Sequence, residues 1–296
     1  MTIILNGLPR KKKKFYTEYY TALQKHFALE VLETQYAAHA EELSFDAAKN
    51  RSPLILVAGG DGTLHQVLNG IMRSHQGATA LGLIPLGSAN DFAKTCSLNT
   101  GPEYLIGLLN AMQPKPTDVG KINCIGFSDA NTERYFMNVC SVGMGPEVVR
   151  RLAGSKGLLG PGFSYLSSIF STFLHHKPQE IACKTPSWEW RGIARVVALA
   201  NGKSFGDSTY IAPDASVEDG ILNSFIAGNV PLWKFLFYLQ TIKGKKKIKD
   251  DAIHYQSASS AELTAAEPCP IEADGELMGT LPARIEILPG KINFLR

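Results

Sequence analysis

Several features that would narrow the class of this protein are missing from its sequence. The apolar stretches at 163–174 and 232–242 are too short and too mixed in polarity to span a bilayer, so we expect no transmembrane segment. The five cysteines are odd in number and widely spaced, and none forms a C-x-x-C pair. This favours free thiols in a reducing cytoplasm over a disulfide framework or a zinc site. The chain opens directly on a strand pattern at 2–5, so we expect no signal peptide.

Strong charge of either sign is also missing. Charged residues make up 19% of the chain and apolar residues 45%, and the net charge of +3 gives no reason to expect a nucleic-acid partner. Two basic clusters stand out, Arg10–Lys14 and the lysines between 243 and 249. Each fits either a solvated surface or contact with phosphates or an anionic membrane, and the sequence leaves both open.

Continuous apolar segments alternate with helical patterns over the first 112 residues. We expect strands at 3–5, 29–33, 53–57 and 80–84, and helices at 16–27, 38–49 and 65–72 with further helical pieces up to 112. This alternation predicts a parallel sheet covered on both faces. Ligand-binding loops of such a sheet gather at the carboxyl ends of its strands.

The pattern changes from about Thr117. Short strands separated by turns are expected at 134–142, 180–184, 188–200, 222–227, 252–256 and 261–265, with helices at 162–175 and 231–242. The predicted fold class is therefore a parallel α/β nucleotide-binding domain, residues 1–118, followed by a mainly antiparallel β-sandwich domain, residues 119–284.

A glycine-rich turn follows the strand predicted at 53–57. Its residues are Gly59, Gly60, Asp61, Gly62 and Thr63, and a helical pattern begins directly after them. Glycines there allow close approach of a ligand, and the start of a helix offers unpaired N–H groups to an anion. The block is neither a Walker loop nor a G-x-G-x-x-G fingerprint, and it favours a phosphate site over an ordinary tight turn.

A second block follows the strand predicted at 80–84, and it reads Pro85-Leu86-Gly87-Ser88-Ala89-Asn90-Asp91-Phe92-Ala93. Together with Gly59–Thr63 it resembles the two signature blocks of the diacylglycerol kinase catalytic family, which includes bacterial lipid kinases and sphingosine kinases. The first block alone would also suit NAD kinases and phosphofructokinases. The resemblance further implies that the segment 285–296 returns to the first domain.

The resemblance implies a set of ATP contacts. The main ones are in the two blocks: Gly59, Gly60, Asp61, Gly62, Thr63, Leu64 and His65, then Gly87, Ser88, Asn90 and Asp91. Asn6 and Thr34 match family nucleotide contacts more loosely, and both also fit simple strand-end caps. This chain departs from the family at His65-Gln66, where Asn-Glu is usual, and at Asn6–Arg10, where Asn-Pro-x-Ser-Gly is usual.

Acidic residues are the implied partners of Mg²⁺. Asp61, Asp91 and Asp118 stand where related bacterial lipid kinases place acids in a network with water and the metal. In the turn 212–222, the resemblance implies that Asp219 binds a metal together with the carbonyls of Ser216 and Ile221. Oxygen ligands suit a hard cation, although Asp-Gly is also a common turn dipeptide.

The resemblance assigns the general base to Glu276, which follows Asp274-Gly275 as in the family's Asp-Gly-Glu block. A carboxylate within hydrogen-bond reach would take the proton of a lipid hydroxyl. Asp61 is assigned as the second catalytic residue. The assignment requires Asp61 and Glu276 to face one cleft between the two domains.

The expected activity is that of an ATP- and Mg²⁺-dependent lipid kinase acting on diacylglycerol or a related lipid such as sphingosine or ceramide. An NAD kinase-like enzyme and a lipid or nucleotide sensor without activity stay as alternatives. We expect a cytoplasmic protein that visits the membrane surface, and the sequence leaves a homodimer open. The aromatics at 233, 235, 237 and 238 have helical spacing, which fits either a core-facing helix or one lying on a membrane.

Overall fold

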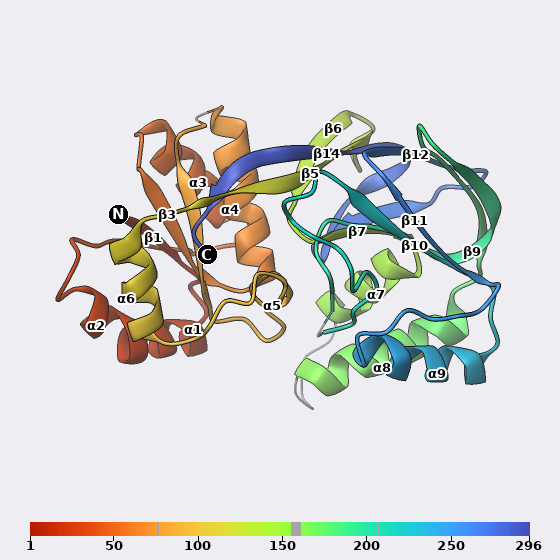
Figure 1. The fold of residues 1–296 in the computed structure, drawn as a ribbon, viewed down its shortest axis with the longest axis horizontal. Helices are drawn as coiled ribbons and strands as arrows, with labels where there is room; N and C mark the ends of the chain where they lie inside the picture. Colours follow the sequence, from red (N-terminus) through yellow and green to blue (C-terminus); the bar gives the residue numbers. More distant parts are fainter. Residues whose placement is uncertain (76, 155–160, 207) are drawn as a thin grey trace. The chain divides into compact units, whose positions relative to one another are not determined.

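Two units of different architecture make up the chain (Figure 1). The computed structural model describes residues 1–75, 77–154, 161–206 and 208–296, without the side chains of 161–164. Unit 1 contains Met1–Val119 and Pro289–Arg296, and unit 2 contains Gly120–Leu288.

A parallel sheet forms the centre of unit 1. Its strand order is β2-β1-β3-β4, and the end of β14 (Glu276–Phe294) joins it at β4. The other strands are β1 (Thr2–Leu5), β2 (Glu30–Glu33), β3 (Leu54–Gly59) and β4 (Ala80–Pro85). Every residue of β1, β3 and β4 is buried, which is typical of parallel strands covered on both faces.

Helices cover this sheet (Figure 1). They are α1 (Pro9–Lys14), the π-helical η1 (Phe15–Tyr20), α2 (Thr21–Leu23), α3 (His39–Lys49), α4 (Asp61–Ser74), α5 (Asp91–Thr95) and α6 (Pro102–Ala111). Buried side chains of η1, α2 and α6 pack on Leu54, Leu56 and Ala58 of one sheet face. A helix was predicted at 16–27. The chain is helical there as far as Leu23, but the helical segment begins earlier, at Pro9, where proline suits the first turn, and its middle part η1 is π-helical.

Unit 2 is mainly antiparallel. Its strands are β5 (Lys115–Ile125), β6 (Asn131–Phe136), β7 (Val139–Gly143), β8 (Gln179–Lys184), β9 (Glu189–Ala200), β10 (Leu222–Gly228), β11 (Ile253–Ala258), β12 (Ser260–Ala265), β13 (Pro270–Ala273) and most of β14. Antiparallel pairing joins β11-β10-β9-β7-β13-β14, and β8 and β12 link β9 to β14. The predicted fold class, a parallel α/β domain followed by an antiparallel β domain, is confirmed.

The strand predicted at 134–142 is two strands. Between β6 and β7, the N–H groups of Met137 and Asn138 donate to the carboxylate of Asp274 at 2.8 and 2.9 Å instead of to a neighbouring strand. A side chain therefore interrupts the ladder at a point where the apolar pattern continues.

Within its described residues, unit 2 contains the helices α7 (Met144–Gly154), α8 (Pro161–His175) and α9 (Leu232–Lys243). Helices α8 and α9 contact each other through Phe173 and Phe235, whose rings stack at 4.1 Å between centroids. Within the described ranges, no helix has both the length and the apolar character needed to cross a membrane.

Two strands run from one unit into the other, β5 and β14. Near their crossing points, Asp118 of β5 accepts a hydrogen bond from the N–H of Gly290 at 2.7 Å. Farther along β14, Phe294 pairs with Leu81 of β4 and packs edge-on against Phe92 of α5. The last residues of the chain thus complete the sheet of unit 1.

Candidate active site

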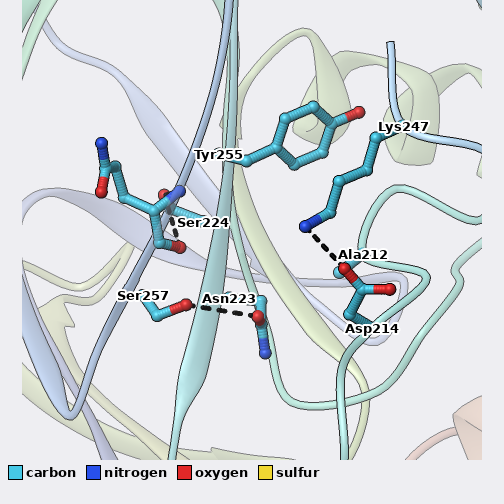
Figure 2. A pocket seen from close by; sticks show the side chains of 8 residues that line it. Ala212, Asp214, Asn223, Ser224, Lys247, Tyr255 and Ser257 are labelled. Atoms are coloured by element: carbon cyan, nitrogen blue, oxygen red, sulfur yellow. Dashed lines mark hydrogen bonds and ion pairs between the residues drawn. The ribbon is translucent and has the colours of Figure 1, made fainter.

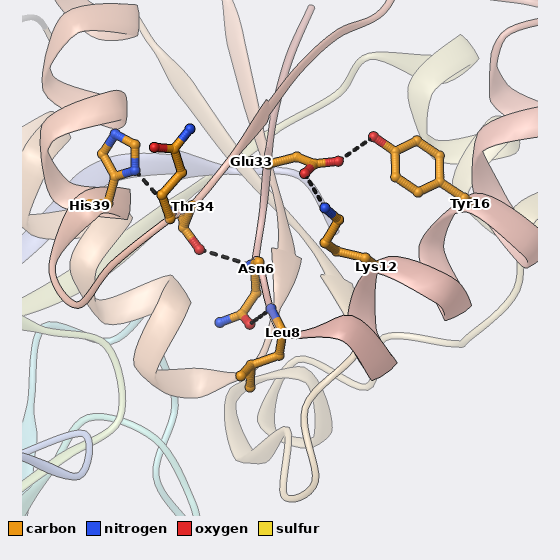
Figure 3. Close-up of polar contacts among 9 residues, drawn as sticks. Asn6, Leu8, Lys12, Tyr16, Glu33, Thr34 and His39 are labelled. Atoms are coloured by element: carbon orange, nitrogen blue, oxygen red, sulfur yellow. Dashed lines mark hydrogen bonds and ion pairs between the residues drawn. The ribbon is translucent and has the colours of Figure 1, made fainter.

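The carboxyl ends of four adjacent parallel strands carry most of the predicted nucleotide contacts. Asn6 follows β1 and donates from Nδ2 to the Thr63 hydroxyl at 2.9 Å. Thr34 follows β2, and its hydroxyl accepts the N–H of Gly7 at 2.8 Å; Figure 3 shows these side chains at the ends of the two strands. Asn6, Thr34 and Thr63 therefore gather at one edge of the sheet, which is where α/β folds bind ligands.

The two glycine blocks meet backbone to backbone. A Cβ added to Gly60 would lie 2.9 Å from the Gly87 Cα, and one added to Gly87 would lie 2.6 Å from the Gly60 Cα. At Gly59, a Cβ would come within 2.7 Å of the Thr63 side chain. Both loops thus need glycine at their contact, because any larger residue would push them apart.

Asp61 joins these two loops. Its carboxylate accepts the N–H groups of Asp91 at 3.2 Å and Phe92 at 3.1 Å, which are the first two residues of α5. A carboxylate at this position satisfies helix N–H groups that have no acceptor within the helix, and it complements the helix dipole. Asp61 therefore has a clear structural task in addition to the catalytic role predicted for it.

Helix α4 begins at Asp61, so the N–H groups of Gly62 and Thr63 lie in its first turn, where helix geometry provides no acceptor. The N–H of Leu64 already donates to the Gly60 carbonyl at 3.0 Å, and the Leu64 side chain is buried. His65 is buried too, against Asn69. Leu64 and His65 therefore offer no exposed side chain to a nucleotide.

Asn90 closes the second loop on itself. Its side chain accepts the N–H of Gly87 at 2.8 Å and donates to the Gly87 carbonyl at 2.9 Å, with Asn90 in the left-handed region. Asp91 is buried at the start of α5. Ser88 lies exposed at the tip of the same loop, so of these residues its hydroxyl is the one presented to solvent.

The basic cluster after β1 has two kinds of lysine. Lys12 forms an ion pair with Glu33, whose carboxylate also accepts the Tyr16 hydroxyl at 2.7 Å (Figure 3). Burial lowers the pKa of Lys11, and the nearby carboxylate of Asp61 partly offsets this. Lys11 thus lies near the glycine loops, although in the sequence it looks like one of five similar surface cations.

In unit 2, the predicted base Glu276 follows a tight hairpin turn between β13 and β14. Asp274 and Gly275 both have positive φ, 51° and 85°, and Ala273 pairs with Glu276 across the turn. Two residues of positive φ are typical of a type I′ hairpin, for which Asp-Gly is a preferred sequence. Asp274-Gly275 therefore forms an ordinary hairpin turn, and this turn is compatible with the role predicted for Glu276.

Buried polar contacts hold this turn. The carboxylate of Asp274 accepts three backbone N–H groups, those of Met137, Asn138 and Val139, at 2.8 to 3.2 Å. Glu272 is buried and accepts the Ser141 hydroxyl and, at 3.1 Å, the N–H of Gly275.

Burial, with a smaller contribution from the carboxylates of Asp274 and Glu276, raises the pKa of Glu272 to about 7, and this outweighs the lowering by the two hydrogen bonds. The supporting roles of Asp274 and Glu272 were not predicted from the sequence. The sequence feature that could have indicated these roles is the presence of two further carboxylates within four residues of Glu276.

Glu276 itself is half-buried. In the parts of the chain that the structure describes, its carboxylate has no hydrogen-bond or ion-pair partner. A carboxylate held beside a rigid turn and not engaged by the protein can accept a proton from a ligand.

The predicted metal ligands come from both units: Asp118 belongs to unit 1, and Ser216, Asp219 and Ile221 belong to unit 2. Asp219 is exposed and accepts the N–H of Ile221 at 3.0 Å, and the Ser216 hydroxyl accepts the N–H of Glu218 at 3.3 Å. Asp118 is buried against Gly290. Among the described residues, no three His, Cys, Asp or Glu side chains cluster as a metal site. Carboxylate and carbonyl oxygens suit Mg²⁺, which commonly uses few protein ligands together with phosphates.

A small pocket in unit 2 has polar walls (Figure 2). It lies beside β10 and β11, where Lys247 forms an ion pair with Asp214 at 2.6 Å. None of the predicted site residues lines it. Lys247, one lysine of the second basic cluster, is therefore neutralised by an acid of the same pocket wall.

Two families match this chain. The diacylglycerol kinase catalytic domain matches residues 1–122, and the YegS C-terminal NAD kinase beta sandwich-like domain matches residues 138–296. The two matches correspond to the α/β architecture of unit 1 and the antiparallel architecture of unit 2.

Individual proteins agree with this. A protein of Xanthomonas euvesicatoria named "Probable lipid kinase YegS-like" is 28% identical over 299 residues, covering 99% of this chain and 94% of the relative. A diacylglycerol kinase of Staphylococcus carnosus is 28% identical over 252 residues, covering 84% and 78%.

A crystal structure of a diacylglycerol kinase from Bacillus anthracis has the same fold, with a TM-score of 0.73 at 19% identity, covering 99% of this chain and 96% of that one. The matched domains and these relatives together show that the chain belongs to the diacylglycerol kinase catalytic family of lipid kinases.

Proposed function

We propose that the chain transfers the γ-phosphoryl group of ATP to a hydroxyl of diacylglycerol or a similar lipid, with Mg²⁺ as cofactor. The single observation that carries the nucleotide part is the contact of the two glycine loops, where Gly60 and Gly87 touch and Asp61 orders α5. Relatives named diacylglycerol kinase favour that lipid, and sphingosine and ceramide stay as alternatives.

In this proposal the phosphates bind at the first turn of α4. The N–H groups of Gly62 and Thr63 and the exposed hydroxyl of Ser88 donate to phosphate oxygens, and Lys11 contributes positive charge. Asn6 and Thr34 act mainly by fixing the neighbouring strand ends, because their side chains already bond to Thr63 and Gly7.

Glu276 accepts the proton of the lipid hydroxyl. As it does so, the hydroxyl oxygen forms a bond to the γ-phosphorus, and the bond from that phosphorus to the β–γ bridging oxygen breaks. The products are ADP and a phosphorylated lipid, and the proton stays on Glu276 until solvent removes it. Asp274 and Glu272 fix the turn that carries Glu276.

Mg²⁺ bound to the phosphates would neutralise charge that develops during transfer. In unit 1, Asp91 and Asp118 are the acids proposed to act with this metal. In unit 2, Asp219 and the Ser216 and Ile221 carbonyls are proposed to bind a metal. Asp118 also accepts the N–H of Gly290 with one of its carboxylate oxygens.

The direct test is transfer of labelled phosphate from ATP to a panel of diacylglycerol, sphingosine and ceramide in mixed micelles, with and without Mg²⁺. We expect label in a lipid only when Mg²⁺ is present. Label in none of the lipids with folded protein would argue for a sensor, and formation of NADP from NAD would argue for a soluble-substrate kinase.

The variant Glu276→Gln tests the base. It keeps the size of the side chain but cannot accept a proton, so we expect turnover to fall by about a hundredfold or more while ATP affinity stays within about twofold of wild type. Glu267→Gln, at an exposed position before β13, is the matched control and should retain full activity. Equal turnover in the two variants would remove Glu276 from the mechanism.

A further inference from the structure

Helix α9 presents apolar side chains on its outer face. Trp233, Leu236 and Phe237 are between 45% and 67% exposed, and their spacing places them on one side of the helix. The opposite side, with Tyr238 and Ile242, packs into the core of unit 2. Residues on one side of α9 therefore face the core, which was one of the two alternatives predicted for the aromatic helix. Trp233 and Phe237 do not face the core.

Helix α8 repeats this arrangement. Leu166, Phe170 and Leu174 recur every four residues and are 42% to 55% exposed, while Ile169 and Phe173 are buried. The two helices lie next to each other in Figure 1, and Phe173 of α8 stacks on Phe235 of α9. Two neighbouring helices thus each expose an apolar stripe, which a soluble protein rarely does without a binding partner.

The charges beside these stripes indicate which partner. Neither helix contains an Asp or Glu, and α9 leads directly into Lys243, Lys245 and Lys246, all exposed. Lys234 and Lys247 are ion-paired with Asp250 and Asp214. Lys243 and Lys246, by contrast, form no ion pair within the described ranges.

Exposed tryptophan, phenylalanine and leucine next to uncompensated lysines match the boundary of an anionic bilayer. There, apolar side chains enter the acyl region and lysines reach phosphate head groups. We propose that the outer faces of α8 and α9, followed by Lys243–Lys246, form the surface by which this protein docks on an anionic lipid membrane. The inference rests on the proposed function, for which the substrate is itself a membrane lipid.

Sedimentation with large unilamellar vesicles tests the apolar part. Wild type should bind vesicles of phosphatidylcholine containing about one third phosphatidylglycerol. The double variant Trp233→Ser/Phe237→Ser should reduce the bound fraction by at least about fivefold. Phe127→Ser, which removes an aromatic that is 62% exposed in the turn between β5 and β6, is the matched control and should bind as wild type.

The charged part is tested in the same assay. Lys243→Glu/Lys246→Glu should weaken binding to the anionic vesicles by about tenfold or more, with added salt weakening wild type in the same direction. Lys184→Glu, a reversal at another exposed lysine, should have little effect. Equal binding of wild type to pure phosphatidylcholine and to anionic vesicles would overturn the role of charge.

Fluorescence gives an independent measurement. Lipids brominated on the acyl chain should quench wild type, and Trp233→Phe should lose most of this quenching because Trp188 and Trp190 belong to another part of unit 2. Unchanged sedimentation of the Trp233→Ser/Phe237→Ser variant would overturn the proposal. The proposal would also be overturned if the wild type were a dimer that binds no vesicles and the Trp233→Ser/Phe237→Ser variant were a monomer.

The kinase reaction separates this proposal from the proposed function. With dioctanoylglycerol in detergent micelles, where no bilayer is needed, all the surface variants should retain wild-type turnover. Absence of wild-type turnover on every lipid would reject the kinase proposal, whereas the sedimentation results would still decide the docking surface.

Discussion

Asp61 is the residue on which the two glycine loops depend most directly. Its carboxylate bonds to the first N–H groups of α5, so its removal should loosen the loop that carries Ser88. We expect Asp61→Ala to lower the free energy of unfolding by about 1 to 2 kcal/mol, and Asp61→Asn by less, because one acceptor oxygen remains. Urea unfolding measures this, with the exposed Asp251→Ala as control. A loss no larger than that of the control would mean that the cap contributes nothing to stability.

Glu272 should make stability depend on pH. Because burial raises its pKa from 4.5 to about 7 in the folded state, folding favours the protonated form. The stabilisation is fully present below about pH 4.5 and is lost as the pH rises through about 7. Between about pH 5 and pH 8 this one group should lower the free energy of unfolding by roughly 2 to 3 kcal/mol.

Glu272→Gln tests that expectation, since the amide does not titrate. The difference in urea-unfolding free energy between the two pH values should shrink by that amount in the variant, and the exposed Glu267→Gln should leave it unchanged. The charged groups that act on Glu272 are the carboxylates of Asp274 and Glu276. Burial first, and then the charge of Glu272, raise the pKa of the Cys140 thiol. An identical pH dependence in wild type and Glu272→Gln would mean that Glu272 does not cause it.

Among the structural elements, the loops after β3 and β4 leave no space between them. Gly87→Ala would place a methyl group 2.6 Å from the Gly60 Cα, so we expect a loss of roughly 1 to 3 kcal/mol in stability and weaker ATP binding. Isothermal titration with ATP and urea unfolding measure both.

Gly107→Ala is the matched control for that substitution. Gly107 lies in α6 with open space around it, so alanine there should raise stability by up to about 1 kcal/mol. A Gly87→Ala variant as stable as wild type would mean that the two loops can separate freely.

Elements with a strong periodic signal were predictable from the sequence. The strands β1, β3 and β4 are continuous apolar runs, and each ends where a loop residue of the candidate site begins. Helix α7 and strand β13 were not predicted. Helix α7 opens with Met-Gly-Pro, which reads as a turn, and β13 is four residues long with a glutamate inside.

The candidate site shows a similar limit. Its glycine blocks and its Asp-Gly-Glu turn stand out in the sequence, and their roles stay predictions. The contacts of Asn6 with Thr63 and of Asp61 with α5 join segments 57 and 30 residues apart and depend on how the strands are ordered. Lys11 is distinguished from Lys12 only by its neighbours in space.

Over the whole molecule, the first unit needs the last residues of the chain. Phe294 is fully buried, pairs with β4 and packs on Phe92. Phe294→Ala should therefore cost about 3 to 5 kcal/mol of stability and weaken ATP binding through α5. Lys291→Ala, at an exposed position of the same strand, should have neither effect in urea unfolding or ATP titration. If the Phe294→Ala variant were destabilised but bound ATP as tightly as wild type, the packing at the sheet edge would have no influence on the nucleotide loops.

The return of β14 to unit 1 also sets a constraint on protein synthesis. When the ribosome has made the first 119 residues, the edge of β4 still has no partner, and none can arrive until residues 289–296 have been made. A nascent chain must therefore keep that hydrophobic edge shielded while the whole of unit 2 is made. A chain that stopped before Pro289 would leave that edge without its strand partner.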